Sequence, residues 1–528
     1  MSSRRGALAL TLRLAAASLT SAATLASAPA AQADTTLRVV LINDLTSLDP
    51  VFSQAAVVRN HGFFVYDQLF ALDSQGVPKP QMVDRYTASD DRLTWRFTLR
   101  DGLAFHDGQP VRAADAVASI KRWAQRDVVG KAMAAATASL DAVDEKSFEL
   151  KLSRPFALVL EALARPTGSA LFVMPERIAR APANTQITDA TGSGPFILRK
   201  EEWRVGDRTV YVRNPAYRPR PEPADGLAGG KEPKVDRIEW LAMPDAAVAA
   251  NALSNGEIDF IEQPPPDLIP QLERNRQLTV KPINPVGYMV WLRPNHAQPP
   301  FDNERARQAL LFAVSQKDVL DGMGIRPAEQ VPYCPAYFMC GTPLETAAGA
   351  RGLKEQDLPR AREYLRQGGY DGSPVVFLNS TEQPLNNAAT LVMAEALKQA
   401  GMNVDLPSMD WGTLGQRRNR KEGWNLFVTV ANAFDAGDPL SNFYLASPCD
   451  GGLSGWPCDK ELETLRHEWW SENDPAKRRA LLDRVQARAY ETVPYVNAGQ
   501  FRTNAAWRAS LTGIRPTTVP VFWGVEKH

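Results

Sequence analysis

Residues 94–111 read TWRFTLRDGLAFHDGQPV, and this is the stretch from which the fold of the chain can best be inferred. Trp95, Phe97 and Leu99 alternate with polar residues, a pattern typical of a strand with one buried face. Asp101-Gly102 follows at once and favours a tight turn. The stretch therefore predicts a strand that ends in a turn.

Similar patterns recur on both sides of this stretch and predict a mixed α/β chain. Apolar or alternating runs indicate strands at residues 36–43, 148–152, 210–212 and 288–292. Apolar residues at helical spacing indicate helices at residues 116–123, 246–253, 303–314, 357–367, 388–400 and 475–492. The strand at 288–292 lies in a proline-punctuated stretch, residues 282–300, which we interpret as a crossing between two lobes.

Length and charge limit the class of protein. A chain of 528 residues exceeds the roughly 250–300 residues that a single core supports, so we expect at least two lobes. Acidic and basic residues number 60 each, which gives a formal net charge of zero. Because no net field attracts polyanions, we expect no nucleic-acid partner.

The N-terminus has the order of a secretory signal peptide. A basic start with Arg4 and Arg5 precedes an Ala/Leu-rich stretch that ends in Ala31-Gln32-Ala33, so we expect export to the periplasm with cleavage after Ala33. A transmembrane anchor is the alternative, but Arg13 and several Ser and Thr residues interrupt the apolar run. Ser3-Arg4-Arg5 leaves Sec and twin-arginine export open, and the lack of a following cysteine argues against a lipid anchor.

Four cysteines form two pairs that are close in sequence, Cys334 with Cys340 and Cys449 with Cys458. In an oxidising compartment, such local pairs predict disulfides. A metal site is the alternative, but the spacings do not resemble C-x-x-C and no histidine flanks either pair. We therefore expect two disulfides and no metal site.

Two segments resemble the start of a catalytic motif, but neither motif is complete. His467-Glu468 starts like a zinc-protease helix, but Ser471 stands where the second histidine would be. Gly192-Ser193-Gly194 lacks the spacing of a nucleophile elbow, and Pro195 indicates a turn. We therefore expect no catalytic residue and no cofactor.

Short motifs in a fixed order carry a resemblance to a known family. They are TSLDP at 46–50, the 94–111 stretch, GSGPF at 192–196, RNPAY at 213–217, SNGEID at 254–259, PPFD at 299–302 and RQAL at 307–310. Together they resemble the family 5 extracellular solute-binding proteins, the dipeptide/oligopeptide-binding group of ABC importers. Most of these motif residues are turn formers, so they identify the family without contacting ligand.

The resemblance implies a two-lobed periplasmic binding protein fold of the α/β class (type II, cluster C-like), with an extra subdomain inserted in the first lobe. The implied division is a signal peptide at 1–33, lobe 1 at 34–285 with the insertion at about 72–190, lobe 2 at 286–499 and a return to lobe 1 at 500–528. Ligand would be enclosed between the lobes by hinge closure.

Asp435 is the ligand residue that the resemblance indicates most directly. It aligns with the family's anchor for the α-ammonium group of a peptide, a role that an enclosed carboxylate suits through charge-assisted hydrogen bonding. Asp435 could instead cap a turn. However, Asp438, directly before Pro439, is the better candidate for a helix cap, which leaves Asp435 free for ligand.

Further ligand residues follow from the same alignment. Trp411 matches a cleft-lining tryptophan and could stack on ligand or cover a cation, although it could equally be core. Arg418 lies at the position of a cleft arginine and could pair with a ligand carboxylate, or it could lie on a solvated face. The other expected ligand residues lie in the segment after Leu48-Asp49-Pro50 or flank Asp435; they are Ser53, Gln54, Asn432 and Phe434.

The expected function is that of the periplasmic substrate-binding component of an ABC importer. It would act as a monomer without catalytic activity, capture a small peptide-like solute and deliver it to the permease subunits in the inner membrane. Members of the family also carry opines, glutathione, nickel complexes, haem or sugars, so a non-peptide solute or metal complex is an alternative. An exported hydrolase with a dispersed catalytic triad is a further alternative that no motif supports.

Overall fold

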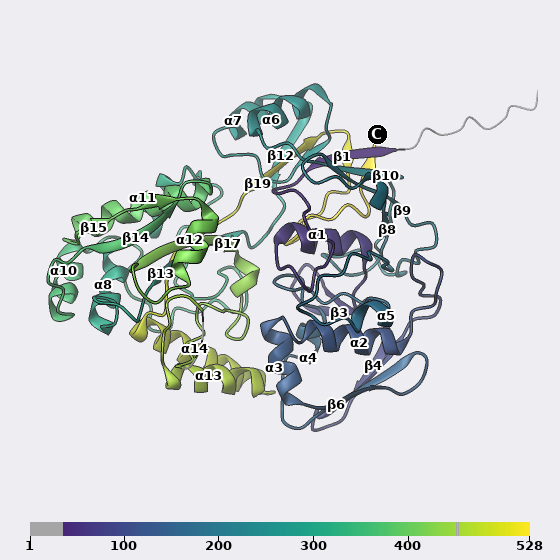
Figure 1. Ribbon diagram of the computed structural model, residues 1–528, viewed down its shortest axis with the longest axis horizontal. Helices are drawn as coiled ribbons and strands as arrows, with labels where there is room; N and C mark the ends of the chain where they lie inside the picture. Colours follow the sequence, from purple (N-terminus) through teal and green to yellow (C-terminus); the bar gives the residue numbers. More distant parts are fainter. Residues whose placement is uncertain (1–34, 450, 452) are drawn as a thin grey trace, which may run out of the picture. The chain divides into compact units, whose positions relative to one another are not determined.

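The computed structural model describes residues 35–449, 451 and 453–528 (Figure 1). The predicted signal peptide and its cleavage point after Ala33 lie outside these residues. The described part is mixed α/β, as the sequence predicts. Two large sheets organise it.

The first large sheet has seven strands in the order β12-β19-β11-β1-β10-β9-β8. The apolar run predicted at 36–43 forms its central strand, β1, which pairs in parallel with β10 and β11. Leu37 and Val39 point to the same face of β1 and are fully buried, whereas the side chain of Arg38 on the other face is partly exposed. The strands are β1 (Thr36–Val40), β8 (Phe196–Leu198), β9 (Arg208–Arg213), β10 (Arg237–Leu241), β11 (Phe260–Ile261), β12 (Leu278–Pro282) and β19 (Asn504–Arg508).

The stretch at 94–111 belongs to a separate antiparallel sheet with the order β4-β5-β7-β6. It forms β5, in which Trp95, Phe97 and Leu99 are buried as the alternation predicts. The helix α2 follows and contributes Ile120 and Trp123 to the same apolar cluster. The elements are β4 (Val83–Ala88), β5 (Thr94–Leu99), α2 (Ala113–Trp123), α3 (Val128–Ala136), β6 (Thr137–Ala142), β7 (Ser147–Leu152), α4 (Val159–Leu163) and α5 (Glu176–Ala179).

The second large sheet has the order β15-β14-β17-β13-β18, with β16 also paired to β14. The predicted strand at 288–292 forms β13, which lies between β17 and β18 and buries Trp291 completely. Helices α13 (Lys460–Ser471) and α14 (Pro475–Thr492) pack against each other and lie side by side in Figure 1. The strands are β13 (Tyr288–Pro294), β14 (Val375–Ser380), β15 (Val404–Asp405), β16 (Ser408–Met409), β17 (Leu426–Asn432) and β18 (Val496–Phe501).

The helices that follow β13 are α8 (Glu304–Ala313), α9 (Gln316–Gly322), α10 (Leu358–Gln367), α11 (Pro384–Gln399), α12 (Trp411–Arg418), the 3-10 helix η2 (Ala433–Ala436), α13 (Lys460–Ser471) and α14 (Pro475–Thr492). The sequence predicts α8, α10, α11 and α14 to within four residues, and it does not predict the others. The remaining elements are α1 (Ala56–Val65), β2 (Phe70–Leu72), β3 (Pro78–Pro80), η1 (Lys200–Glu202), α6 (Ala246–Asn255), α7 (Ile269–Arg274), β20 (Leu511–Thr512) and β21 (Glu526–Lys527).

The chain passes between the two large sheets at two places that lie close together. One passage runs from the end of β12 to the start of β13, within the stretch where the sequence predicts a crossing, and the other runs from β18 to β19. Gly287 has a φ of +70°, and a Cβ on it would lie 2.0 Å from the carbonyl oxygen of Phe501. Only glycine permits this approach of the two passages. The lobe boundaries given above stay predictions.

Both cysteine pairs form the predicted disulfides. Cys334 is bonded to Cys340 and Cys449 to Cys458, with Cα–Cα distances of 5.7 Å and 4.3 Å. No helix among the described residues is long and apolar enough to cross a membrane.

Candidate functional site

Helix α1 places polar residues inside an otherwise apolar, buried segment. All residues from Val57 to Val65 are buried, including Arg59, Asn60 and His61. His61 Nδ1 lies 2.9 Å from the Tyr211 hydroxyl, and burial lowers the pKa of His61 to about 3, so this ring is neutral. Arg59 is therefore the one formal charge on the buried face of the helix, and it is directed at Asp435.

Asp435 lies in η2, directly after the strand β17. Its Oδ1 accepts a hydrogen bond from the Gly168 N–H at 3.0 Å and lies 3.8 Å from Nη1 of Arg59. The Asp435 side chain is 23% exposed and that of Arg59 only 7%. The predicted ammonium anchor thus meets a backbone donor and a buried guanidinium, both from segments far away in the sequence.

The loop that carries Gly168 is held by buried polar contacts. Arg165 Nε donates to Asp127 Oδ2 at 3.0 Å, and Asp127 also caps α3 through the N–H groups of Val129 and Gly130. Gly168 has a φ of +67°, a conformation that favours glycine and turns its N–H toward Asp435. The shape of the loop is therefore held by contacts within the protein.

Glu262 and Tyr288 border the same group of charges. Burial raises the pKa of the Glu262 carboxyl to about 7, while a hydrogen bond from the Ile42 N–H and the nearby Arg59 oppose that rise. Burial also raises the pKa of the Tyr288 hydroxyl, and the charges of Glu262 and Asp435 raise it further. The surroundings of Arg59 are thus poorly solvated, and electrostatic interactions there are strong.

Ser53 and Gln54 lie in the turn before α1, close to this loop. Gln54 Nε2 donates to the Ser169 hydroxyl at 3.0 Å, so Gln54 contacts the loop that holds Asp435. The Ser53 hydroxyl accepts from the Ala55 N–H at 3.4 Å and serves the turn before α1. Gln54 is exposed and keeps its amide oxygen for other partners.

Asn432 and Phe434 position η2. Asn432 Oδ1 accepts from the Phe434 N–H at 3.0 Å, and its Nδ2 donates to the Thr518 carbonyl oxygen at 3.0 Å. Both ends of this amide are engaged with the protein, which orients the helical turn that carries Asp435. Phe434 packs at the edge of the apolar core.

The prediction of a helix that starts at Asp438 is wrong, because the segment forms a turn. Asp438 Oδ1 accepts from the N–H groups of Leu440 and Ser441 at 2.8 Å and 2.9 Å, and its Oδ2 accepts from the Ser441 hydroxyl at 2.6 Å. The serine closes the turn before a helix can propagate. Asp438 nevertheless makes the capping hydrogen bonds of this turn, and Asp435 makes none of them.

Trp411 and Arg418 contact each other on α12. The Arg418 guanidinium carbon lies 5.1 Å from the ring centres of both Trp411 and Phe427, which are cation–π contacts. Arg418 Nη1 is buried and has no hydrogen-bond partner among the described residues. No hydrogen bond or ion pair in the described chain joins this pair to Asp435, so the structure shows two groups of predicted ligand residues.

Sequence reasoning missed Arg59, Thr167, Gly168 and Glu262. None of them belongs to a motif that the resemblance singles out. One signal for Arg59 was present: a run of Arg, Asn and His interrupts the apolar sequence AVVRNHGFFV. A buried charge in such a helix is rare unless it has a partner, and that partner is a functional candidate.

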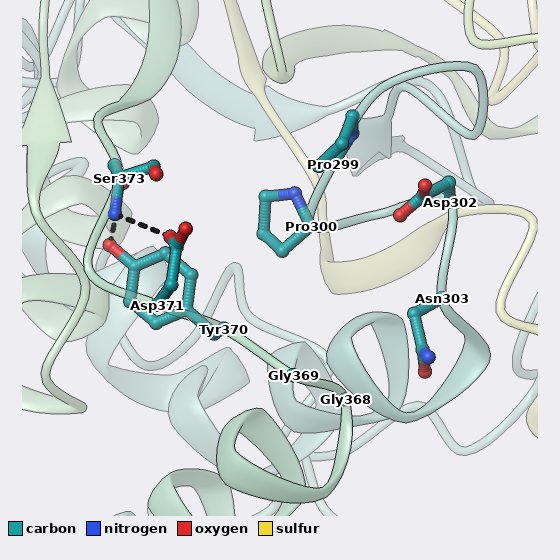
Figure 2. A pocket seen from close by; sticks show the side chains of 9 residues that line it. All are labelled: Pro299, Pro300, Asp302, Asn303, Gly368, Gly369, Tyr370, Asp371 and Ser373. Carbon is teal, nitrogen blue, oxygen red and sulfur yellow. Dashed lines mark hydrogen bonds between the residues drawn. The ribbon is translucent and has the colours of Figure 1, made fainter.

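A pocket of about 360 Å³ is lined by the residues drawn in Figure 2, and several of its polar groups form local hydrogen bonds. Asp371 Oδ1 accepts from the Ser373 N–H at 2.9 Å, the Tyr370 hydroxyl donates to the Ser373 carbonyl oxygen at 2.8 Å, and Asn303 caps α8. Asp435 and its contacts do not line it. The lining residues are Pro299, Pro300, Asp302, Asn303, Gly368, Gly369, Tyr370, Asp371 and Ser373.

The chemistry around Asp435 is that of binding. A carboxylate and a guanidinium lie side by side, so a ligand with an ammonium group or a carboxylate could be bound there. Among the described residues, no group of three His, Cys, Asp or Glu side chains is placed to hold a metal ion.

Comparisons with known proteins agree with this picture. The model for "Bacterial extracellular solute-binding proteins, family 5 Middle" matches residues 77–453. A protein of Sinorhizobium fredii named as a probable peptide ABC transporter periplasmic-binding protein is 36% identical over 507 residues, covering 94% of each chain. A glutathione-binding protein of Escherichia coli is 25% identical over 493 residues, covering 90% of this chain and 91% of its own.

Among solved structures, a dipeptide-binding protein from a Pseudoalteromonas species in complex with Met-Leu has a TM-score of 0.77 at 18% identity, covering 93% of this chain and 100% of its own. This likeness shows the fold, which is that of the two-lobed periplasmic binding proteins. The family match covers most of the chain and includes both the 94–111 stretch and Asp435. The chain therefore belongs to the family 5 bacterial extracellular solute-binding proteins.

Proposed function

We propose that this protein is the periplasmic substrate-binding component of an ABC importer and that it captures a small peptide-like solute. The relative at 36% identity is named as a peptide-binding component, which supports this assignment. After export and cleavage behind Ala33, the protein would act as a monomer and deliver its solute to permease subunits in the inner membrane.

One observation carries the peptide assignment. Asp435 Oδ1 is held by the Gly168 N–H, while Oδ2 accepts no hydrogen bond from any described residue. A carboxylate that is oriented through one oxygen can bind an ammonium group with the other. The N-terminus of a peptide supplies such a group.

A thermal-shift panel of di- and tripeptides, each paired with its N-acetylated form, tests the proposal. A ligand at 100 times its dissociation constant stabilises the protein by about 2.7 kcal/mol, which is a measurable shift. We expect free peptides to raise the melting temperature and acetylated peptides not to, because acetylation removes the positive charge. If another solute shifts melting and no peptide does, the peptide assignment fails and the solute-binding role stands.

Asp435→Asn tests the anchor itself. It removes the charge but keeps the shape, so affinity for free peptides should fall by about 10- to 100-fold, the equivalent of one charge-assisted hydrogen bond. Asp371→Asn is the matched control, because Asp371 is exposed and serves a local turn. Calorimetry that gives both variants the wild-type affinity would remove Asp435 from the site.

A non-peptide solute is the second candidate, and Arg59 favours it. A guanidinium beside the anchor suits ligands that carry a carboxylate next to their ammonium group, and one relative is named as glutathione-binding. Assays of the purified protein for ester and peptide turnover would separate both candidates from an exported hydrolase.

A further inference from the structure

Arg59 is a buried cation that forms no hydrogen bond with the described part of the protein. Its side chain is 7% exposed, its Nε is buried without a partner, and none of its N–H groups donates a hydrogen bond to a described residue. Asp435 Oδ1, at 3.8 Å, is beyond the range of about 2.7–3.2 Å for such a bond. Because unbonded buried donors are costly and rare, Arg59 requires an acceptor.

Neighbouring groups do not supply that acceptor. Glu262 accepts from the Ile42 N–H at 3.1 Å and forms no ion pair with Arg59 in the described structure. The second arginine near Asp435, Arg165, is already bonded to Asp127. Thr167, next to Gly168 in the same loop, is fully buried and its hydroxyl also lacks a partner among the described residues.

Arg59 and Asp435 thus offer opposite charges side by side. Asp435 keeps Oδ2 for a donor, and Arg59 keeps its planar fork of donors for an acceptor. An α-amino acid head group has the complementary arrangement, since its ammonium and its carboxylate are attached to one carbon atom.

We propose that Arg59 and Asp435 together bind the head group of a free α-amino acid moiety, with the ammonium on Asp435 and the α-carboxylate on Arg59. The inference rests on the proposed solute-binding function and narrows it to a ligand class. This class comprises γ-linked peptides and other amino-acid conjugates in which both groups on the α-carbon are free. An ordinary α-peptide offers Arg59 only a neutral amide oxygen, which is a weaker acceptor.

Arg59 and Asp435 lie on helical segments next to different large sheets. A head group bound by both residues would therefore also link these two parts of the protein. Arg59 is on α1, which packs against β8 of the seven-stranded sheet, and Asp435 follows β17 of the six-stranded sheet. A head group bound by both residues stabilises the arrangement in which they face each other. Ligand affinity then depends on the free energy of the arrangement in which Arg59 and Asp435 face each other.

Two isomeric dipeptides test this inference without a change of charge or composition. γ-L-Glutamyl-L-alanine keeps its α-carboxylate free, whereas α-L-glutamyl-L-alanine uses it in the peptide bond. We expect calorimetry to show about 10- to 100-fold tighter binding of the γ isomer, as one charge-assisted interaction is worth this much. Arg59→Met should abolish the preference, and Arg59→Lys should retain part of it because the charge remains.

Arg360→Met is the matched control, because Arg360 is an exposed residue of α10 whose guanidinium packs over Phe312 and Tyr364. It should leave the preference for the γ isomer intact. Equal or tighter binding of the α isomer overturns the inference, and so does a preference that persists in Arg59→Met. Absence of binding by both isomers up to millimolar concentration also overturns it. The panel of free and acetylated peptides judges the proposed function separately.

Discussion

Two arginine–aspartate pairs of this chain, Arg122–Asp49 and Arg59–Asp435, each have a buried arginine but differ in how completely their polar atoms are bonded. Arg122 donates to both oxygens of Asp49 at 3.0 Å and 2.7 Å, and to the carbonyl oxygens of Ala181 and Thr185 at 3.1 Å and 3.2 Å. Arg59 has one contact with Asp435 at 3.8 Å and no hydrogen bond within the described chain.

The difference in hydrogen bonding suggests a different role for each of the two pairs. Burial disfavours the charge of Asp49, yet hydrogen bonds from Arg122 and from backbone N–H groups outweigh it and hold its pKa below the ordinary value. Glu262, beside the unbonded Arg59, has a pKa raised to about 7 by burial. We therefore interpret the completely bonded pair as one that holds the fold, and we propose that the incompletely bonded pair binds ligand.

Breaking the complete pair should have the largest effect. Arg122→Met leaves Asp49 buried without its cation, and we expect a loss of about 3–5 kcal/mol in the free energy of unfolding. Urea denaturation followed by circular dichroism measures this. A loss below about 1 kcal/mol would show that the Leu48-Asp49-Pro50 turn does not depend on the pair.

Glu262 adds a dependence of stability on pH near the incompletely bonded pair. Its pKa in the folded protein is raised to about 7 from the ordinary 4.5, so its contribution to stability is present below pH 4.5 and is lost as pH rises through about 7. Glu262→Gln should remove this decline, which we expect to be roughly 2–3 kcal/mol. Unfolding free energies measured at pH 4.5 and 8 should therefore differ more in the wild type than in the variant. An identical difference in both proteins would show that Glu262 does not titrate in this range.

Replacing the incompletely bonded arginine should have the smallest effect on stability. Arg59→Met removes a buried charge that makes no hydrogen bond, and Asp435 keeps the Gly168 N–H and some solvent. We expect the free energy of unfolding to change by less than about 1 kcal/mol or to rise. Urea denaturation checks this, and a loss as large as that of Arg122→Met would make Arg59 a structural residue.

Much of the fold follows from local patterns in the sequence. The alternation of Trp95, Phe97 and Leu99 predicts β5, and the helical spacing that ends at Trp123 predicts α2, because side-chain periodicity decides which face is buried. The disulfides follow from cysteine spacing. The helix expected at Asp438 failed because Ser441 completes a turn instead.

The site could be predicted only in part. The resemblance indicates Asp435, but its contact with Gly168 joins residues 267 positions apart, and no local pattern encodes such a meeting. The pairing of Asp49 with Arg122 could not be predicted from the sequence either, although the turn that contains Asp49 was predicted. Tertiary contacts decide which charges meet, and therefore which of them remain unbonded.

The melting temperatures of Arg59→Met and Arg122→Lys, with and without saturating ligand, would separate the structural pair from the proposed binding pair. The ligand is the strongest binder of the amino-acid and peptide panel, and Arg122→Lys keeps the charge while losing the bidentate fork. We predict that Arg122→Lys melts lower but keeps the ligand-induced shift, and that Arg59→Met melts near the wild type but loses most of the shift. If Arg59→Met melts lower and keeps the shift, the assignment of the two pairs to structure and binding is contradicted.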